Sequence, residues 1–357
     1  MEIKKKKVFV GASGGVDSST AMAILNEQGY DVTGVFIKVW QPDFVECQWK
    51  EDRLDAMRVC ATLGVQFLDL DLEEEYKKGV FNYMVDGYKN GRTPNPDVMC
   101  NKKIKFGAFL DFALENGADH VATGHYVRLE DGKLLAGVDK NKDQSYFLWT
   151  LTAEQLKYCL FPIGGYEKTR VREMAKKFKL STAQKKDSQG LCFVGKVNMK
   201  EFLERFIPQK KGNVLNEKGE VIGEHDGVFY YTLGQRHGFL ITKKGTDDKP
   251  YYIVKKDLEK NELVVSNIVV GDSSDKSSEV QPPEIEVGEV NWIVGEMPDL
   301  SKQYKARVRY RQILQDCRLV ERDGKFMVEF DVFQNVDQGQ SIVFYDGEIC
   351  LGGGVVK

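Results

Sequence analysis

The chain has 357 residues, of which 42% are hydrophobic and 29% charged, and this composition is typical of a folded globular protein. Its length favours two or three domains. The net charge of −3 gives no sign of a nucleic-acid partner by itself, and no apolar run reaches the roughly 18 residues of a membrane span. The first predicted strand begins almost at once, so we expect no signal peptide, no membrane association and a cytoplasmic location.

A glycine- and serine-rich segment at residues 11–19 follows a predicted buried strand at 6–10 and precedes a predicted helix at 20–25. Backbone N–H groups at such a turn, at the N-terminus of a helix, bind phosphate. The common motifs G-x-x-x-x-G-K-[ST] and G-x-G-x-x-G are both absent from the chain. The segment predicts a different phosphate-binding loop, made by Gly11, Ala12, Ser13, Gly14, Gly15, Val16, Asp17 and Ser18.

Strands and helices alternate through the rest of the first half of the chain. Strands are predicted at 31–37, 65–70 and 119–124, and helices at 51–63 and 104–114. Such alternation predicts a parallel sheet with helices on both faces, which binds ligands at the carboxyl ends of its strands. Gly11, Ile37 and Gly124 fall at such ends.

The second half of the chain reads as short β-strands. Strand-like pieces at 213–224, 229–233 and 251–254, with a short helix at 233–236, precede a polar stretch at 271–278 and two prolines. Asp-Gly pairs at 323–324 and 346–347 predict hairpins in a small antiparallel barrel. Its strands are predicted at 285–292, 304–309, 317–321, 325–330, 341–345 and 348–351. We therefore predict an α/β protein with a catalytic domain at 1–205, a small central domain at 206–281 and a C-terminal barrel at 282–357.

Seven cysteines without a C-x-x-C pair argue against a disulfide framework and against a metal site built from protein residues alone. Most lie in apolar settings, and Cys47 has no assignment. Cys100 and Cys192 differ, because each lies in a basic loop. The prolines at 94 and 96 are expected to hold the first loop extended, with Asn101 capping a helix that begins near Ile104. A thiol at that helix N-terminus, beside three lysines, should be reactive.

These residues resemble those of PP-loop ATP pyrophosphatases and, more specifically, of bacterial tRNA-specific 2-thiouridylases. Ala12 and Ile37 are small departures from the family pattern, since leucine or methionine is common at the first position and methionine at the second. The matching segments run in order along nearly the whole chain, at 11–19, 95–107, 122–126, 142–148, 186–195, 231–238 and 308–312.

The resemblance implies that ATP, with Mg²⁺, adenylates O2 of the wobble uridine of a tRNA and releases pyrophosphate. It assigns Cys192 as the carrier of a persulfide, loaded by a sulfur carrier or a cysteine desulfurase, and Cys100 as the nucleophile that releases the sulfur or closes a transient disulfide with Cys192. The residues alone do not order the two cysteines. Asp97 is either an acid/base at the uracil edge or a simple turn residue.

By the same resemblance, Asn95, Pro96 and Asp97 line the pocket of the target base. Lys142, Asp143, Gln144, Arg309 and Tyr310 are expected to contact the tRNA, although a basic solvent-facing strand is an alternative for the last two. Two other classes remain open from the sequence. One is an ATP pyrophosphatase that acts on a small molecule, and the other is an RNA-binding protein with a degenerate nucleotide loop.

Overall fold

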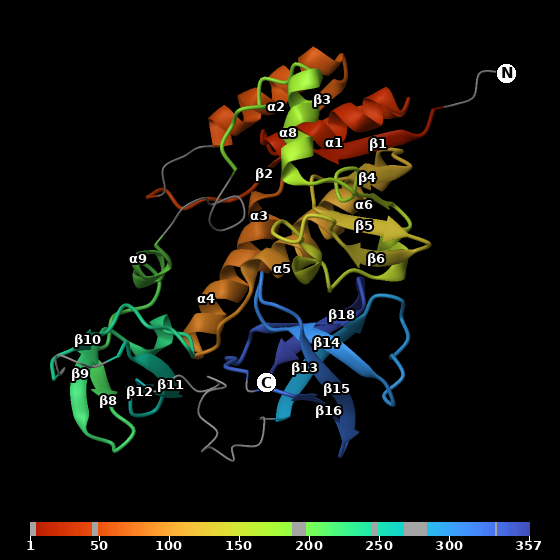
Figure 1. Ribbon diagram of the computed structural model, residues 1–357. Helices are drawn as coiled ribbons and strands as arrows, with labels where there is room; N and C mark the ends of the chain where they lie inside the picture. The colour runs from red at the N-terminus through yellow and green to blue at the C-terminus, as the bar shows by residue number, and fades with distance from the viewer. Residues whose placement is uncertain (1–4, 45–48, 188–197, 244–248, 268–283, 333) are drawn as a thin grey trace.

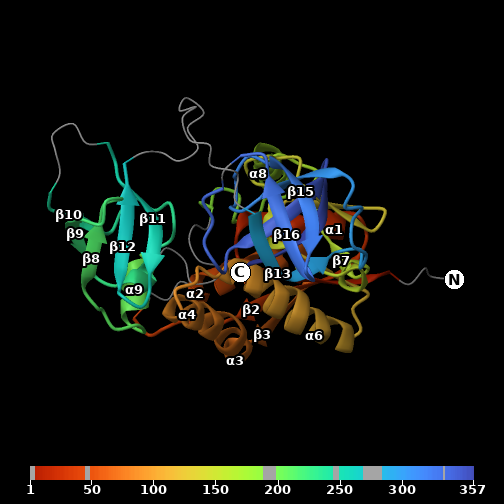
Figure 2. The same cartoon turned by 90° about the horizontal axis from the view of Figure 1, so that it is seen from below.

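The computed structural model describes residues 5–44, 49–187, 198–243, 249–267, 284–332 and 334–357. Cys47 and Cys192 lie outside these residues. The N-terminal α/β part, a central sheet and a C-terminal barrel follow one another along the chain, and the central sheet and the barrel lie side by side below the N-terminal part (Figures 1 and 2). No helix among the described residues is both long and apolar enough to cross a membrane.

The N-terminal part contains the predicted parallel sheet, with five strands in the order β3-β2-β1-β4-β7. Val8, Phe9 and Val10 are at most 1% exposed, because helices cover both faces of β1. Val8 and Val10 belong to the same buried cluster as residues of α1, α2 and α8, whereas Phe9 contacts Phe112 of α6, with 6.1 Å between the ring centroids. The strands are β1 (Lys7–Gly11), β2 (Asp31–Lys38), β3 (Gln66–Asp71), β4 (His120–Ala122) and β7 (Cys159–Leu160).

The predicted helices at 20–25 and 51–63 are confirmed as parts of α1 and α2, whereas the helix predicted at 104–114 begins earlier. A continuous helical segment, α5 followed by a π-helix and α6, begins at Pro96 and not near Ile104. The Asn95 side chain caps it by accepting a hydrogen bond from the Val98 N–H at 3.2 Å, and Pro96 takes the first helical position, where its missing N–H costs nothing. The predictions that Asn101 is the cap and that both prolines keep the segment extended are therefore wrong.

The helices and the short hairpin of the N-terminal part have the following bounds. They are α1 (Val16–Glu27), α2 (Trp49–Leu63), α3 (Glu73–Tyr76), η1 (Lys77–Phe81), α4 (Asn82–Lys89), α5 (Pro96–Cys100), η2 (Asn101–Ala108), α6 (Phe109–Glu115), β5 (Val127–Glu130), β6 (Lys133–Ala136), η3 (Ser145–Phe147), α7 (Ala153–Leu156) and α8 (Lys168–Lys177).

The central part is a five-stranded sheet in the order β10-β9-β8-β12-β11. The predicted strand at 229–233 is instead a short 3₁₀-helix, η4, because the Asn261 side chain accepts from the Val228 N–H at 3.1 Å and Tyr230 donates to the Ile207 carbonyl. Residues 233–236 form no helix, and only Leu233 and Gly234 of them lie in a turn. The elements are α9 (Met199–Glu204), β8 (Gly212–Leu215), β9 (Val221–His225), η4 (Val228–Tyr230), β10 (Leu240–Ile241), β11 (Tyr252–Asp257) and β12 (Glu262–Ser266).

The predicted antiparallel barrel is confirmed, since pairing between its first and last strands, β13 and β18, closes the sheet. Asp323 and Gly324, both with positive φ, turn the chain between β15 and β16 as the Asp-Gly signal requires. The β5–β6 hairpin of the N-terminal part joins the same sheet through Leu135 and Ile349. The barrel strands are β13 (Glu284–Trp292), β14 (Gln303–Arg307), β15 (Gln315–Arg322), β16 (Lys325–Phe330), β17 (Ser341–Asp346) and β18 (Ile349–Val356).

A buried ion pair joins the three parts of the chain. Lys256 of β11 is 7% exposed and Asp337, just before β17, is 4% exposed, and their charged atoms are 2.5 Å apart. The Lys256 ammonium also donates to the carbonyls of Gly91 and Tyr231, while Thr93 donates to Asp337. The connection before α5 is thereby fixed to both other parts.

Replacing Asp337 by alanine is expected to destabilise the protein by about 3–5 kcal/mol, because it leaves the Lys256 charge buried without its carboxylate. Urea unfolding of the full chain measures this loss. The double variant Lys256→Met/Asp337→Leu is the control and should lie closer to the parent, since it removes both charges. A loss below about 1 kcal/mol, the range of exposed pairs, would contradict the prediction.

Candidate active site

The predicted phosphate-binding loop connects β1 to α1 at the carboxyl edge of the sheet. Gly15 is the N-cap of α1, and Ser13 and Ser18 join their hydroxyls at 3.0 Å across the turn. Gly14 has φ of +67°, and a Cβ there would lie 2.2 Å from the Asp52 carbonyl of α2. A side chain at this position would therefore force the loop away from α2.

Ile37 and Gly124 both lie beside this loop, at the ends of neighbouring strands. A Cβ on Gly124 would lie 2.6 Å from the Ser18 nitrogen, so the first turn of α1 packs directly on this backbone. Ile37 lines a pocket that opens next to Ser13 and is largely apolar. Its walls are formed by Ser13, Phe36, Ile37, Val39, Gln41, Trp49 and Asp52.

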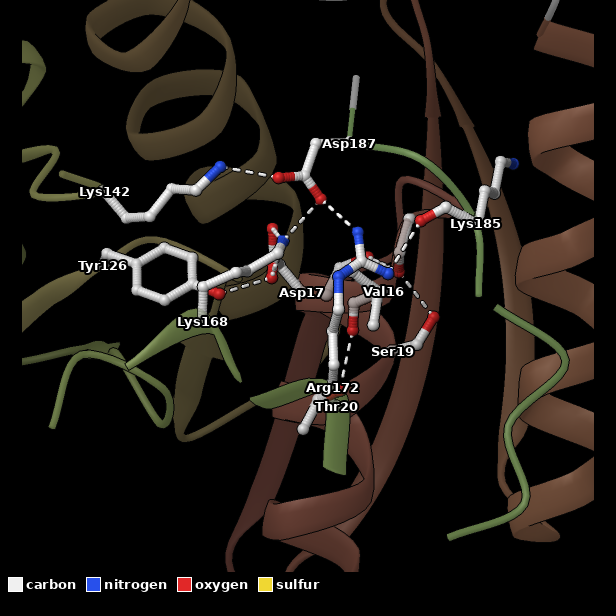
Figure 3. Close-up of polar contacts among 12 residues, drawn as sticks. Val16, Asp17, Ser19, Thr20, Tyr126, Lys142, Lys168, Arg172, Lys185 and Asp187 are labelled. Carbon is white, nitrogen blue, oxygen red and sulfur yellow. Dashed lines mark hydrogen bonds and ion pairs between the residues drawn. The ribbon is translucent and has the colours of Figure 1, made fainter. Parts of the chain in front are cut away.

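Asp17 stands in the first turn of α1, and its carboxylate is held by two other elements (Figure 3). Lys168, the first residue of α8, places its ammonium 2.8 Å from both carboxylate oxygens. The Tyr126 hydroxyl donates to the same carboxylate at 2.7 Å. The acid of the loop is thus engaged with a cation in this state.

Lys168 also binds a second carboxylate, that of Asp187, at 2.8 Å. Asp187 accepts two further cations, Lys142 and Arg172, each at 2.6 Å (Figure 3). Burial opposes charge on Asp187, but Lys142 and Lys168 outweigh it and hold the pKa of Asp187 well below its usual range. The carboxylate therefore stays ionised at neutral pH, and the ion pairs run without a break from Asp17 to Lys142.

Burial, followed by the nearby Asp17 carboxylate, raises the pKa of Tyr126 far above its usual value. Tyr126 therefore keeps its proton and remains a hydrogen-bond donor to Asp17.

Lys185 contacts two carboxylates of α2, those of Asp52 and Asp55, both at 2.7 Å. Lys185 and Asp187 precede the segment that contains Cys192. Lys185 is thus held by α2, and Asp187 is held by Lys168 and Arg172 of α8.

Cys100 ends α5, inside the continuous helical segment that begins at Pro96, and is completely buried. The prediction that its thiol lies at a helix N-terminus is therefore wrong. Lys102 and Lys103, expected beside it, are exposed to solvent. Lys105 is half-buried, with its ammonium 3.5 Å from the His125 ring. The helix that carries Cys100 reaches the sheet through Phe109, which lies 3.7 Å from where a Cβ on Gly11 would stand.

Four residues of this region are not among the predicted site residues, although three of them lie in the matching segments at 122–126 and 186–195. Lys168, Asp187 and Tyr126 are named above, and the fourth is His125, whose ring lies 2.7 Å from the Thr123 hydroxyl. Burial and then Lys105 lower the pKa of His125 well below its usual value, so the ring is neutral. His125 and Tyr126 directly follow Gly124, which is the signal that would have found them.

The residues expected to contact a polynucleotide fall into two groups. Lys142 and Gln144 are half-buried, but Asp143 is buried and binds Arg307 of the barrel at 2.6 Å. Asp143 also accepts from the Gly137 N–H and the Ser145 hydroxyl, so its side chain fixes the loop to the barrel. We therefore assign it a supporting role, since a buried carboxylate is a poor partner for phosphate.

Arg309 and Tyr310 lie in the turn after β14 and not on a strand face. The exposed Arg309 donates to the carbonyls of Leu233 and Asn335, both at 3.0 Å. The Tyr310 ring lies 4.7 Å from that of Phe147, with Arg311 stacked over it. The Phe147 carbonyl in turn accepts from Asn101, the residue after Cys100. Phe147 thus connects the turn to the helix of Cys100, since its ring contacts Tyr310 and its carbonyl accepts from Asn101.

Three family models match the chain in order. They are described as a tRNA methyl transferase HUP domain at 6–196, a tRNA methyl transferase PRC-barrel domain at 200–267 and an aminomethyltransferase beta-barrel domain at 283–356. These ranges correspond to the α/β part, the central sheet and the barrel.

Curated relatives match the chain over 99% of its length and the whole of their own. A tRNA-specific 2-thiouridylase MnmA from Francisella tularensis subsp. novicida is 45% identical, and one from Francisella philomiragia is 44% identical. Among solved structures, the U34-tRNA thiolase NcsA from Methanococcus maripaludis has a TM-score of 0.37 at 18% identity, over 58% of this chain and 69% of that one. This structural likeness is too low to support an argument. The first family model alone matches more than half of the chain, and on that match and the identity to full-length relatives, the chain belongs to the tRNA-specific 2-thiouridylase family.

Proposed function

We propose that this protein uses ATP to replace O2 of the wobble uridine of tRNA with sulfur, and that it releases AMP and pyrophosphate. The observation that carries the proposal is the phosphate-binding loop at the carboxyl edge of the sheet, with the Cys100 helix packed beneath the same strand. Uracil O2 is a poor leaving group, and attack of O2 on the α-phosphate turns it into part of AMP, which leaves readily.

The residues proposed to bind ATP are Ile37 and Gly124 together with the loop at 11–18. The apolar pocket beside Ile37 accepts the adenine, while the N-terminal turn of α1 faces the phosphates. No group of three or more His, Cys, Asp or Glu that could hold a metal occurs in the part of the chain that the structure describes. A lone carboxylate suits Mg²⁺, which is usually held by one or two carboxylates and the substrate phosphates, so Asp17 is the residue proposed to hold it. When bound, Mg²⁺ screens the phosphate charge.

The sulfur is proposed to come from a persulfide on Cys192, supplied by a sulfur-carrier protein or a cysteine desulfurase. Its terminal sulfur attacks C2, and AMP departs with the oxygen. The Cys100 thiolate then attacks the inner sulfur of Cys192, which leaves thiouridine and a Cys100–Cys192 disulfide. In the alternative order, Cys100 first releases the sulfur from Cys192 as sulfide, which attacks C2 itself. Asp97 is proposed to move the proton at the uracil edge.

Contacts to the tRNA are proposed for Lys142, Gln144, Arg309 and Tyr310, with Asn95, Pro96 and Asp97 around the target base. Asn95 caps α5 by accepting a hydrogen bond from the Val98 N–H, so its side chain is already held at the start of the helix. A base in an anticodon loop is already unpaired, which lowers the cost of turning it into such a pocket. Domains at 1–205, 206–281 and 282–357 and a cytoplasmic location, where tRNA is available, belong to the same proposal.

Mass spectrometry of tRNA incubated with the protein, ATP, Mg²⁺ and a sulfur source tests the proposal. We expect one uridine to exchange an oxygen for a sulfur, at the wobble position. The descriptions of two matching family models name methyl transfer, and gain of a methyl group from a methyl donor without ATP would overturn the proposal. ATP cleavage that proceeds equally well without tRNA would instead favour a small-molecule ATP pyrophosphatase.

Replacing Arg309 by alanine is expected to weaken tRNA binding by about 1–3 kcal/mol, because an exposed guanidinium in the turn after β14 suits a phosphate. Binding should also weaken as salt rises, through counterion release. Filter binding measures both effects. Lys325→Ala, which removes an exposed cation from the β15–β16 hairpin, is the matched control. Equal affinities for the two variants would count against this contact.

A further inference from the structure

The unbroken series of ion pairs in Figure 3 connects two sites that the proposed function keeps separate. One end is Asp17 of the phosphate-binding loop, and the other is Lys142 of the loop at 139–145. Between them, Lys168 and Asp187 each contact both neighbours, so the order is Asp17, Lys168, Asp187, Lys142. The side chain of Lys168 is 11% exposed, so its charge is largely shielded from solvent. Those of Asp187 and Lys142 are each about a quarter exposed, so Lys142 at the end of the series can still reach a ligand.

The charges in this series do not balance pair by pair. Asp187 has three cationic partners, Lys142, Lys168 and Arg172, whereas Lys168 is shared between two carboxylates. Arg172 is fixed independently, since it also donates to the carbonyls of Ala183 and Lys185, both at 3.0 Å. The two lysines are therefore the members free to exchange partners, and a change at one end alters how strongly Asp187 holds the other.

We propose that Asp187 is a positioning residue that couples ATP binding to tRNA binding by holding Lys142 back until ATP is bound. This inference rests on the proposed function, because it takes Lys142 as a tRNA contact and Asp17 as the residue that meets the metal ion accompanying ATP. Once Asp17 binds that ion in place of Lys168, Asp187 is the one remaining carboxylate partner of Lys168 in this series, and the ion pair between the two becomes stronger. Asp187 is then satisfied by Lys168 and Arg172, and Lys142 becomes available to a tRNA phosphate.

Two consequences follow from this arrangement. ATP with Mg²⁺ tightens tRNA binding, and by thermodynamic reciprocity tRNA tightens ATP binding by the same factor. Because the pairs are partly exposed, we expect a factor of about five, at the low end of typical couplings. ATP in the presence of a chelator should not produce the effect, since Asp17 then has no ion for which to exchange Lys168.

The test is the dissociation constant of tRNA, measured with and without a non-hydrolysable ATP analogue and Mg²⁺, for the full chain and three variants. Asp187→Asn releases Lys142 permanently, so it should bind tRNA more tightly than the parent without nucleotide and lose the response to nucleotide. A gain in affinity is not what a damaged fold would give. Lys142→Gln should bind tRNA weakly under both conditions, again with no response.

The matched control is Glu348→Gln, which frees Lys140 of the same loop from a comparable ion pair at 2.7 Å and also removes the ion pair of Glu348 with Arg128. Neither of these ion pairs involves Asp17 or Asp187. This variant should keep the parent's response. The inference is overturned if the parent shows no response while still thiolating tRNA, or if Asp187→Asn or Lys142→Gln keeps the full response. A parent that does not thiolate tRNA at all would instead refute the proposed function.

Discussion

Replacing Cys192 by serine is expected to abolish sulfur transfer while ATP and tRNA still bind, because serine cannot carry a persulfide. Replacing Cys100 by serine should leave persulfide loading of Cys192 intact and stop turnover at a later step. Mass spectrometry of the intact protein detects the persulfide, and mass spectrometry of the tRNA detects the product. Each variant is expected to give no thiouridine above background.

The other cysteines offer matched controls. Cys159 and Cys317 are buried, and burial raises the pKa of each thiol to about 12, so neither is a thiolate at neutral pH. Alanine at either position should keep full activity per folded molecule, as should serine at Cys47. Full thiolation by Cys192→Ser with a physiological sulfur carrier would end the two-cysteine mechanism, and so would an essential cysteine outside the pair.

Replacing Ser13 or Asp17 by alanine is expected to lower the rate of ATP cleavage by about a hundredfold or more. A loss of this size is typical when a group that stabilises the charge developing in the transition state is removed. Ser13 bonds to Ser18 within the loop, and Asp17 engages Lys168, so neither side chain packs in the core. The variants should therefore stay folded, since in Asp17→Ala the ammonium of Lys168 keeps its second carboxylate, Asp187. Release of pyrophosphate and AMP, followed by chromatography, is the measurement.

Two comparisons sharpen this experiment. Ser301→Ala, in a turn of the barrel, removes a surface hydroxyl that donates a hydrogen bond to Asp299. This variant should leave ATP cleavage unchanged. For the parent protein, the products decide the reaction class. ADP and free phosphate in place of AMP and pyrophosphate would contradict the assignment of the loop.

The sequence by itself determined the order of the three parts, the parallel sheet, the glycine-rich connection between β1 and α1, and the closed barrel. These features depend on local patterns: apolar runs mark the strands, and glycine at positions such as 14 and 324 supplies the positive φ that a turn requires. Family resemblance of short segments assigned the reactive roles to Cys100 and Cys192, and that assignment stays a prediction. Cys100 lies on α5, and Cys192 lies outside the described residues.

Only the tertiary structure decided where helix α5 begins and which charges meet. Asparagine is a favourable N-cap residue, so the sequence offers both Asn95 and Asn101 as caps. In the structure, Asn95 caps the helix by accepting from the Val98 N–H, whereas the buried Asn101 side chain donates to the Phe147 carbonyl. The sequence around Asp143 predicts an exposed acidic residue in a loop, but the side chain is buried in an ion pair with Arg307 of the barrel. Lys168 is 151 positions from Asp17, and no periodicity or spacing encodes an ion pair across such a separation. Such contacts arise when independently predicted elements pack together, and their geometry exists only in the folded chain.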